Sequence, residues 1–212
     1  MFTLQATAFN FPSSYSEALG PKYSHHDNYP IAEELYKTYS TSSNYELFPD
    51  ALQFLESIQR LRKDGNITVG ALTNYDRRIH DLVKLLGLSS KLDFVLCSED
   101  AKSSKPESDI FLAGLKCASR HGTEGTSSGF SLNKIFFFMG KQYVAIRVGP
   151  IDAREILHIG DDIANDYEGA RRVGWNALLI NRKNGDAISG VDSAHICRDF
   201  NVVARKLGLE IK

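Results

Sequence analysis

The chain has 212 residues, of which 42% are hydrophobic and 24% are charged. This length and composition suit one globular domain, or a core domain with a small appendage. The 25 Lys and Arg residues nearly balance the 26 Asp and Glu residues, so the net charge is -1. Such a balance excludes the broad basic field that attracts nucleic acids and anionic membranes. We therefore expect no nucleic acid or membrane partner, and we expect any anion-binding site to be local.

The cysteines and the apolar segments indicate a reducing compartment. Cys97, Cys117 and Cys197 lie far apart in the sequence and form no C-x-x-C pair, which favours reduced thiols with a packing role over a disulfide framework. The longest apolar runs are too short to cross a bilayer, and the chain does not open on a basic segment followed by an apolar stretch. The sequence therefore predicts an intracellular protein of the cytoplasm or nucleus.

The chain divides into two parts of different character. Residues 1–46 begin with a turn-rich segment that lacks a hydrophobic period, and a helix is predicted at residues 31–39. Residues 47–212 carry the pattern of a core domain, with an insertion near residues 121–150. We expect the first part to be an irregular N-terminus with a short helical remnant.

Buried strands alternate with amphipathic helices through the second part. The expected helices are 50–62, 79–86, 109–118 and 165–173, and the expected strands are 67–72, 94–97, 156–159 and 177–180. This alternation predicts an α/β fold with a parallel sheet and right-handed crossovers. In such sheets ligands bind beyond the carboxyl ends of the strands, so residues that follow the strands are candidates for a site.

The segment at residues 121–150 interrupts this alternation. Its first part, residues 121–129, is rich in Gly, Ser and Thr and predicts a flexible loop. Two short apolar runs follow at residues 134–139 and 143–148, separated by Gly140 and Lys141. We expect these runs to form a β-hairpin.

An acidic segment follows the strand at residues 156–159. Asp161 ends that strand, and Asp166 lies in the first turn of the next helix. Mg²⁺ prefers oxygen ligands and commonly uses one or two carboxylates plus a substrate phosphate, so Asp161 and Asp166 are candidate metal ligands. The alternative is that Asp162, Asn165 and Asp166 are turn and helix-capping residues.

Two further segments could hold a phosphate at the same edge of the sheet. Thr73 and Asn74 follow the strand at residues 67–72, where a hydroxyl and backbone N–H groups can donate to phosphate oxygens. Lys105, which precedes Pro106, would offset the negative charge of the phosphate. Helix capping is the alternative role for Thr73 and Asn74, and an ordinary solvated surface residue is the alternative for Lys105.

In this order the three segments resemble the haloacid dehalogenase (HAD) superfamily over residues 47–180, and most closely its eukaryotic haloacid dehalogenase-like hydrolase domain-containing protein 3 group. The resemblance implies a Rossmann-like three-layer sandwich with a mostly parallel sheet, and residues 30–36 look like the end of the family's helical cap. It implies phosphate monoester hydrolysis with Mg²⁺ on a small phosphorylated molecule. The implied roles are phosphate binding by Thr73, Asn74 and Lys105, charge stabilisation by Lys105, and Mg²⁺ binding by Asp161 and Asp166.

The sequence departs from that family where the family's nucleophile belongs. The family begins with a strand that ends in Asp-x-Asp, and the sequence contains no such motif. Asp27 follows His25 and His26 without a preceding strand, and a polar loop is the favoured interpretation over a metal site there. The missing strand is also the centre of the family's sheet, and residues 2–9 are the N-terminal segment with the most β character. A truncated or alternative transcript, or an imperfect gene model, would explain the departure.

Two functions remain open on these observations. The first is a phosphatase-type hydrolase that is catalytically inactive as given because it lacks the nucleophile. The second is a non-catalytic binding or regulatory module on a HAD-like fold. A response-regulator receiver is disfavoured because its acidic pair lies on the first strand, and a dinucleotide-binding enzyme because no G-x-G-x-x-G follows a strand. The substrate and the oligomeric state are not determined by the sequence.

Overall fold

The computed structural model describes residues 45, 47–62, 67–121, 135–137, 144–146, 153–183 and 187–209. The predicted irregular N-terminus with its helix at residues 31–39 and the candidate strand at residues 2–9 lie outside this part. Most of the predicted loop at residues 121–129 lies outside it as well. The division of the chain into two parts therefore remains a prediction. None of the helices in the described ranges is long and apolar enough to span a bilayer.

One sheet runs through the described part of the chain. Its order is β2-β1-β3-β5-β6-β7, and the pairs along this path are parallel. β4 pairs antiparallel with β1. The strands are β1 (Thr68–Thr73), β2 (Phe94–Cys97), β3 (Ile135–Phe137), β4 (Val144–Ile146), β5 (Ile156–Gly160), β6 (Asn176–Ile180) and β7 (Ile196–Cys197).

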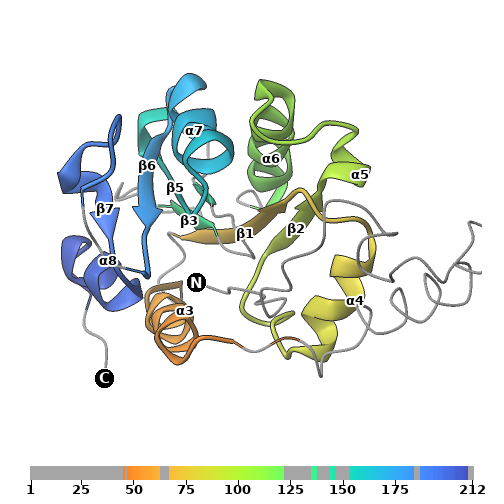
Figure 1. Cartoon of the computed structure of the whole chain (residues 1–212). Coiled ribbons are helices and arrows are strands. Elements are labelled where there is room, and N and C mark those ends of the chain that lie inside the picture. The colour runs from red at the N-terminus through yellow and green to blue at the C-terminus, as the bar shows by residue number, and fades with distance from the viewer. Residues whose placement is uncertain are drawn as a thin grey trace, which may run out of the picture.

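Helices cover both faces of this sheet, which gives three layers (Figure 1). α6 and α7 lie over one face, and α3, α4 and α8 lie over the other. The predicted Rossmann-like α/β fold is confirmed. The α-helices are α3 (Pro49–Arg62), α4 (Arg78–Leu85), α5 (Ser98–Ala101), α6 (Ser108–His121), α7 (Gly169–Arg172) and α8 (Phe200–Lys206), and the shorter helical segments are η2 (Ala153–Glu155), η3 (Ile163–Glu168) and η4 (Ser193–His195).

Aromatic pairs mark the two halves of the core. Phe54 of α3 packs on Phe200 of α8 with ring centroids 5.1 Å apart, and both are fully buried. On the other face, Phe111 of α6 packs edge-on against Trp175 at 5.2 Å. Each helix buries its apolar side against the sheet, as the alternation of strands and amphipathic helices predicts, whereas the aromatic pairs themselves were not predicted.

The centre of the sheet differs from the sequence-based expectation. β3 occupies the position between β1 and β5 and pairs in parallel with both, while β4 pairs with β1. The prediction that these two segments form a hairpin is therefore wrong. A central parallel strand forms backbone hydrogen bonds on both sides and lies in apolar surroundings. The sequence Ile-Phe-Phe of β3 suits that position better than residues 2–9, which contain Thr and Gln.

The helix predicted at residues 165–173 begins earlier and is not regular. η3 is a π-helical segment, and α7 continues it as an α-helix. The Asp162 carboxylate accepts from the Asn165 N–H at 2.9 Å and caps η3, while the Asp162 carbonyl accepts from the Asp166 N–H at 3.0 Å and the Tyr167 N–H at 3.2 Å. The capping role that the sequence offered for Asp162 is thus present. The side chains of Asp166 and Tyr167 are the buried ones of η3.

Candidate functional site

The candidate site lies at the carboxyl edge of the sheet. Thr73 ends β1, and Gly160 ends β5 directly before Asp161. Because β1, β3 and β5 are parallel, the ends of β1 and β5 point to the same edge. The topology thus brings together residues that are far apart along the chain.

Asn74 connects the end of β1 to the segment that carries Lys105. The Asn74 amide nitrogen donates to the Lys105 carbonyl at 3.0 Å, and the Lys105 N–H donates to the Asn74 side-chain oxygen at 2.8 Å. The Thr73 hydroxyl accepts from the Tyr75 N–H at 3.1 Å, which shapes the turn after β1. Two reciprocal bonds fix the backbone of Lys105 against the strand end, so this segment has a defined position in the site.

The Lys105 side chain turns into the protein and forms an ion pair with Asp166. Its ammonium donates to Asp166 Oδ1, and both side chains are fully buried. Burial lowers the pKa of Lys105, and the negative charges of Asp166, Asp161 and Asp162 oppose that shift. Burial would raise the pKa of Asp166, but Lys105 and the hydrogen bond from His158 outweigh it and hold this pKa below its usual value. A buried pair of this kind is costly to break, because one unpaired charge remains in the interior.

His158 is a site residue that the sequence interpretation missed. It lies in β5, is fully buried, and its Nε2 is 3.2 Å from Asp166 Oδ1. Because a carboxylate only accepts, Nε2–H is the donor in this bond. Phe111 packs edge-on against the imidazole at 5.5 Å and holds the ring. The signal was present in the sequence as a single histidine inside an otherwise apolar strand, because a buried polar residue needs a partner.

Gly160 leaves the space that the Asp166 carboxyl group fills. A Cβ at position 160 would overlap that group. We expect Gly160→Ala to lower the free energy of unfolding by roughly 1–3 kcal/mol through overpacking, measured by urea denaturation. Gly208→Ala is the control, since Gly208 has a φ of +67° and open space around it. Gly208→Ala reports the cost of a side chain at positive φ, a conformation that Gly160 does not adopt. A loss below about 0.5 kcal/mol in Gly160→Ala would mean that the Asp166 carboxyl group shifts aside and that the overlap does not set a cost.

The two predicted metal ligands have different surroundings. Asp166 is fully buried; its Oδ1 accepts from Lys105 and His158, and its Oδ2 accepts from the Asp162 N–H at 3.0 Å. These contacts fit the role of holding Lys105. Asp161 is half-buried at the end of β5, a position that fits an oxygen ligand for Mg²⁺. Metal binding by Asp161 and Asp166 stays a prediction.

The five predicted residues form one connected group. Thr73 and Asn74 are neighbours in the chain, and Asn74 forms hydrogen bonds with Lys105. Lys105 forms an ion pair with Asp166, and the negative charge of Asp161 acts to raise the pKa of Lys105. A wide, open depression of about 810 Å³ lies beside this group, and Asn74 is the member that lines it. The rest of its lining, which includes Tyr75, Asp76, Ser98 and Glu99, comes from the segments that follow β1 and β2. Thr73, Lys105 and Asp166 instead lie beneath the surface.

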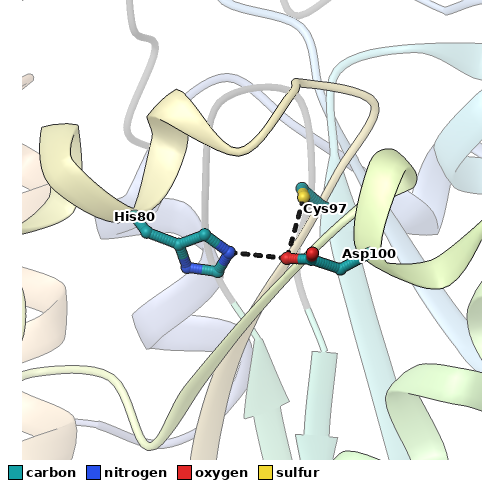
Figure 2. A group of neighbouring side chains, drawn as sticks. All are labelled: His80, Cys97 and Asp100. Carbon is teal, nitrogen blue, oxygen red and sulfur yellow. Dashed lines mark hydrogen bonds and ion pairs between the residues drawn. The ribbon is translucent and has the colours of Figure 1, made fainter.

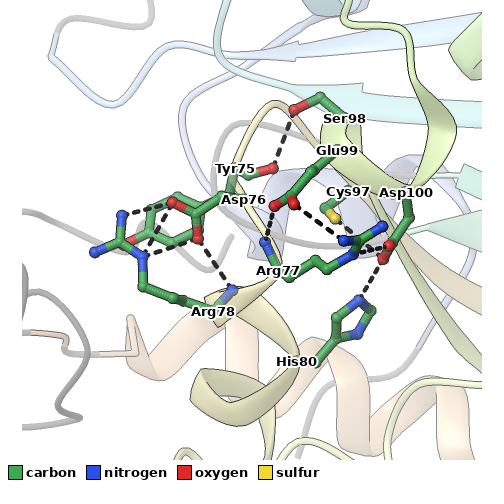
Figure 3. A network of polar contacts seen from close by, with 9 residues as sticks. All are labelled: Tyr75, Asp76, Arg77, Arg78, His80, Cys97, Ser98, Glu99 and Asp100. Carbon is green, nitrogen blue, oxygen red and sulfur yellow. Dashed lines mark hydrogen bonds and ion pairs between the residues drawn. The ribbon is translucent and has the colours of Figure 1, made fainter.

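A second polar group lies next to Ser98 and Glu99, two residues that line the same depression. His80, Cys97 and Asp100 come together from α4, β2 and α5 (Figure 2). Arg77 joins them to Glu99 on the rim, and the Ser98 hydroxyl donates to the Tyr75 carbonyl at 3.0 Å (Figure 3). Packing was the predicted role for the cysteines, and the free Cys97 is indeed buried, but its thiol also donates to Asp100. The sequence interpretation did not identify this group.

The sequence of this chain is similar to those of known proteins. The family model described as haloacid dehalogenase-like hydrolase matches residues 12–125, and a second model, described as HAD-hydrolase-like, matches residues 133–201. Haloacid dehalogenase-like hydrolase domain-containing protein 3 of Bos taurus is 30% identical over 151 residues, which cover 71% of this chain and 46% of that protein. The protein of the same name from Danio rerio is 27% identical over 178 residues, covering 84% and 59%. The chain spans about half the length of the curated relatives that it matches.

Solved structures share the fold. A HAD phosphatase from Thermococcus onnurineus superposes with a TM-score of 0.59 at 24% identity, covering 85% of this chain and 66% of that one. A 2-haloacid dehalogenase from Pseudomonas syringae pv. Tomato DC3000 gives 0.57 at 20% identity, covering 88% and 64%. The predicted resemblance is therefore confirmed by sequence and by fold. The chain belongs to the haloacid dehalogenase-like hydrolase family.

Proposed function

We propose that the connected group at the carboxyl edge is the site of a phosphatase-type hydrolase that uses Mg²⁺ and acts on a phosphate monoester of a small molecule. The observation that carries this proposal is the fixed position of Lys105. Its backbone is held by Asn74, and its ammonium is held by Asp166 at the edge where parallel sheets bind ligands. A fixed positive charge at that edge is suited to stabilise a phosphate without reorganisation during the reaction.

Thr73, Asn74 and Asp161 have complementary parts in this proposal. Thr73 and Asn74 would bind phosphate oxygens through hydroxyl, amide and backbone N–H groups. Asp161 would hold Mg²⁺, and Asp166 would act mainly by keeping Lys105 in place, because both Asp166 oxygens already have partners inside the protein. When bound, Mg²⁺ would neutralise part of the charge on the phosphate.

We further propose that the 212-residue chain does not hydrolyse phosphate esters by itself. The resemblance to the family places the attacking Asp at the end of the central strand, and β3 in that position has the sequence Ile-Phe-Phe followed by Phe138, Met139 and Gly140. None of these six residues carries a carboxylate that could attack phosphorus. The general acid and base of the family, a contribution of typically about 10²–10⁴-fold, is missing with the same motif.

The same observation favours a second candidate, a non-catalytic module that binds a phosphorylated ligand or regulates a partner. Lys105 and the strand ends would then supply binding without turnover. The two candidates share the site and differ in whether a nucleophile reaches it. Turnover by this chain would favour the first candidate over the second, whereas its absence is expected from both.

The purified chain is to be assayed with an activated aryl phosphate and Mg²⁺, beside an Asp161→Asn variant. We expect both to release phosphate at the uncatalysed rate, because stabilised charge alone does not replace the nucleophile. Turnover in the wild type that disappears in Asp161→Asn would contradict the inactive assignment and make Asp162 the first nucleophile to test. Mg²⁺ titration of the same two proteins tests the metal site, and equal affinity would remove Asp161 from it.

A further inference from the structure

Three potential metal ligands of different chemistry converge beside the depression, outside the group that carries the proposed function. His80 is on the outer side of α4, Cys97 ends β2, and Asp100 lies in α5. Their nitrogen, sulfur and oxygen atoms all lie within 4.8 Å of one another. Figure 2 shows the imidazole and the thiol pointing at the same carboxylate oxygen. Contacts from three separate elements to one point are the arrangement that a metal site requires.

The two carboxylate oxygens of Asp100 have different hydrogen-bond partners. Oδ2 is 2.7 Å from His80 Nε2 and 3.2 Å from Cys97 Sγ, while Oδ1 accepts from Arg77 Nε at 2.6 Å. Arg77 also donates to Glu99 at 3.1 Å, so its guanidinium is itself positioned (Figure 3). The hydrogen bonds to Arg77 and His80 keep the pKa of Asp100 well below its usual range, so the carboxylate is ionised. Arg77 thus orients Asp100 in the way that outer hydrogen bonds orient metal ligands, and Oδ2 faces the other two ligand atoms.

We propose that His80, Cys97 and Asp100 form a binding site for one zinc-like divalent cation. A donor set of one nitrogen, one sulfur and one oxygen is typical of zinc and unlike the all-oxygen shell of Mg²⁺ or Ca²⁺. Zinc bonds of about 2.0–2.3 Å in a tetrahedron separate the ligand atoms by about 3.3–3.8 Å. The distances from Asp100 Oδ2 to His80 Nε2 (2.7 Å) and to Cys97 Sγ (3.2 Å) therefore need to lengthen by about 0.7 Å and about 0.4 Å, within reach of the His80 side chain, which is 38% exposed.

Binding exchanges protons for the metal without a redox change. The Cys97 thiol carries a proton when it donates to Asp100, and this proton leaves to solvent as the S–Zn bond forms. His80 Nε2 gives up the hydrogen of its bond to Asp100 to solvent and binds through the freed lone pair, the neutral imidazole then carrying its one proton on Nδ1, and water completes the fourth position. Before the metal binds, Asp100 and the nearby Glu99 carry two negative charges against the single positive charge of Arg77, and the loss of the Cys97 proton adds a third. The net local charge therefore favours a dication.

The occupied site would cross-link the elements around the depression. α4, β2 and α5 meet there, and Ser98 and Glu99 on its rim lie between the ligands Cys97 and Asp100 in sequence. Metal binding would thereby fix the rim next to Asn74 without involving Lys105 or Asp161. This inference does not depend on the proposed phosphatase function.

Co²⁺ and Zn²⁺ titrations of the reduced, metal-free chain test the site. His25 and His26 could bind added metal together, so the experiment uses a His25→Ala, His26→Ala background. We expect one equivalent of Co²⁺ to produce a thiolate-to-cobalt charge-transfer absorption that Zn²⁺ removes. His80→Asn and Asp100→Asn are each expected to weaken the affinity by at least about 10-fold, as the loss of even an outer-shell partner does.

A matched pair of cysteine variants decides the identity of the sulfur ligand. Cys97→Ser is expected to abolish the charge-transfer absorption, while Cys117→Ser, at a half-buried cysteine of α6, retains it. No thiolate absorption in the background protein, or its persistence in Cys97→Ser, would overturn the proposal. If Cys97→Ser fails to fold by circular dichroism, the half-exposed His80→Asn variant decides, and unchanged affinity in that variant overturns the proposal.

Discussion

Replacing Lys105 by methionine is expected to lower the free energy of unfolding by about 3–5 kcal/mol, the usual cost of removing one partner from a buried ion pair. Methionine has a similar volume, so the loss reports the charge of Asp166 that remains in the interior. Both side chains are fully buried, and solvent therefore screens the pair weakly. Urea denaturation at neutral pH measures the loss. Lys116→Met, at an exposed position of α6, is the control and is expected to change stability by less than about 0.5 kcal/mol.

The pH dependence of this loss identifies its cause. In the wild type the pKa of Asp166 is lowered, so its stabilising contribution is present above its unfolded pKa and is lost as the pH falls through the folded value. Without Lys105, burial is expected to raise the pKa of Asp166 above the unfolded value. Protonation of Asp166 then removes the unpaired charge from the variant as the pH falls. The difference in the free energy of unfolding between wild type and Lys105→Met should therefore shrink between neutral pH and about pH 5.

A double variant separates the charge from the packing. Lys105→Met with Asp166→Asn removes both charges and keeps an acceptor for the Asp162 N–H, so we expect it to be more stable than Lys105→Met alone. If the second substitution adds a further loss, or if the single-variant deficit does not change with pH, the buried charge is not the origin of the effect.

Phe111→Ala is expected to lower the free energy of unfolding by about 3–5 kcal/mol. Phe111 is fully buried and contacts both Trp175 and His158 edge-on. A Cβ added at Gly169 would lie 2.9 Å from the Phe111 ring, which shows how tightly α7 packs on it. Truncation would therefore open a cavity and remove the support of the imidazole that donates to Asp166.

The neighbouring residue provides the control for Phe111. Leu112 lies on the same helix but is 45% exposed, so Leu112→Ala is expected to cost less than about 1 kcal/mol. Denaturant unfolding of both variants measures the difference. Similar losses for the two would mean that helix propensity, and not the core contact, governs this position.

The sequence predicted the elements that depend on local patterns. β2 was predicted at its observed limits, and β1, β5 and β6 were predicted within one residue at either end. Their apolar runs are bounded by turn residues, and that signal does not depend on the rest of the fold. The π-helical start of η3 was not predicted, because the wider turn follows from the internal contacts of Asp166 and leaves no mark in residue spacing.

The candidate site was predictable in its location and less so in its contacts. Strand ends in a parallel sheet share one edge, so Thr73 and Asp161 could be assigned to it from the chain order alone. The inward turn of Lys105 could not be predicted in this way. Lys105 pairs with Asp166, which lies 61 positions away along the chain. This pair belongs to a buried network that includes His158. Whether a lysine lies in solvent or in a buried pair depends on what the fold brings next to it.

By itself, the sequence determined the family, the alternation of strands and helices, and the absence of an Asp-x-Asp motif, because each of these is written in the order of residues. Only the tertiary structure decided that β3 is the central strand and that His80, Cys97 and Asp100 meet at one point. The physical reason is that pairing partners and side-chain convergence are set by crossovers between distant segments. Local propensity carries no information on which distant segments meet.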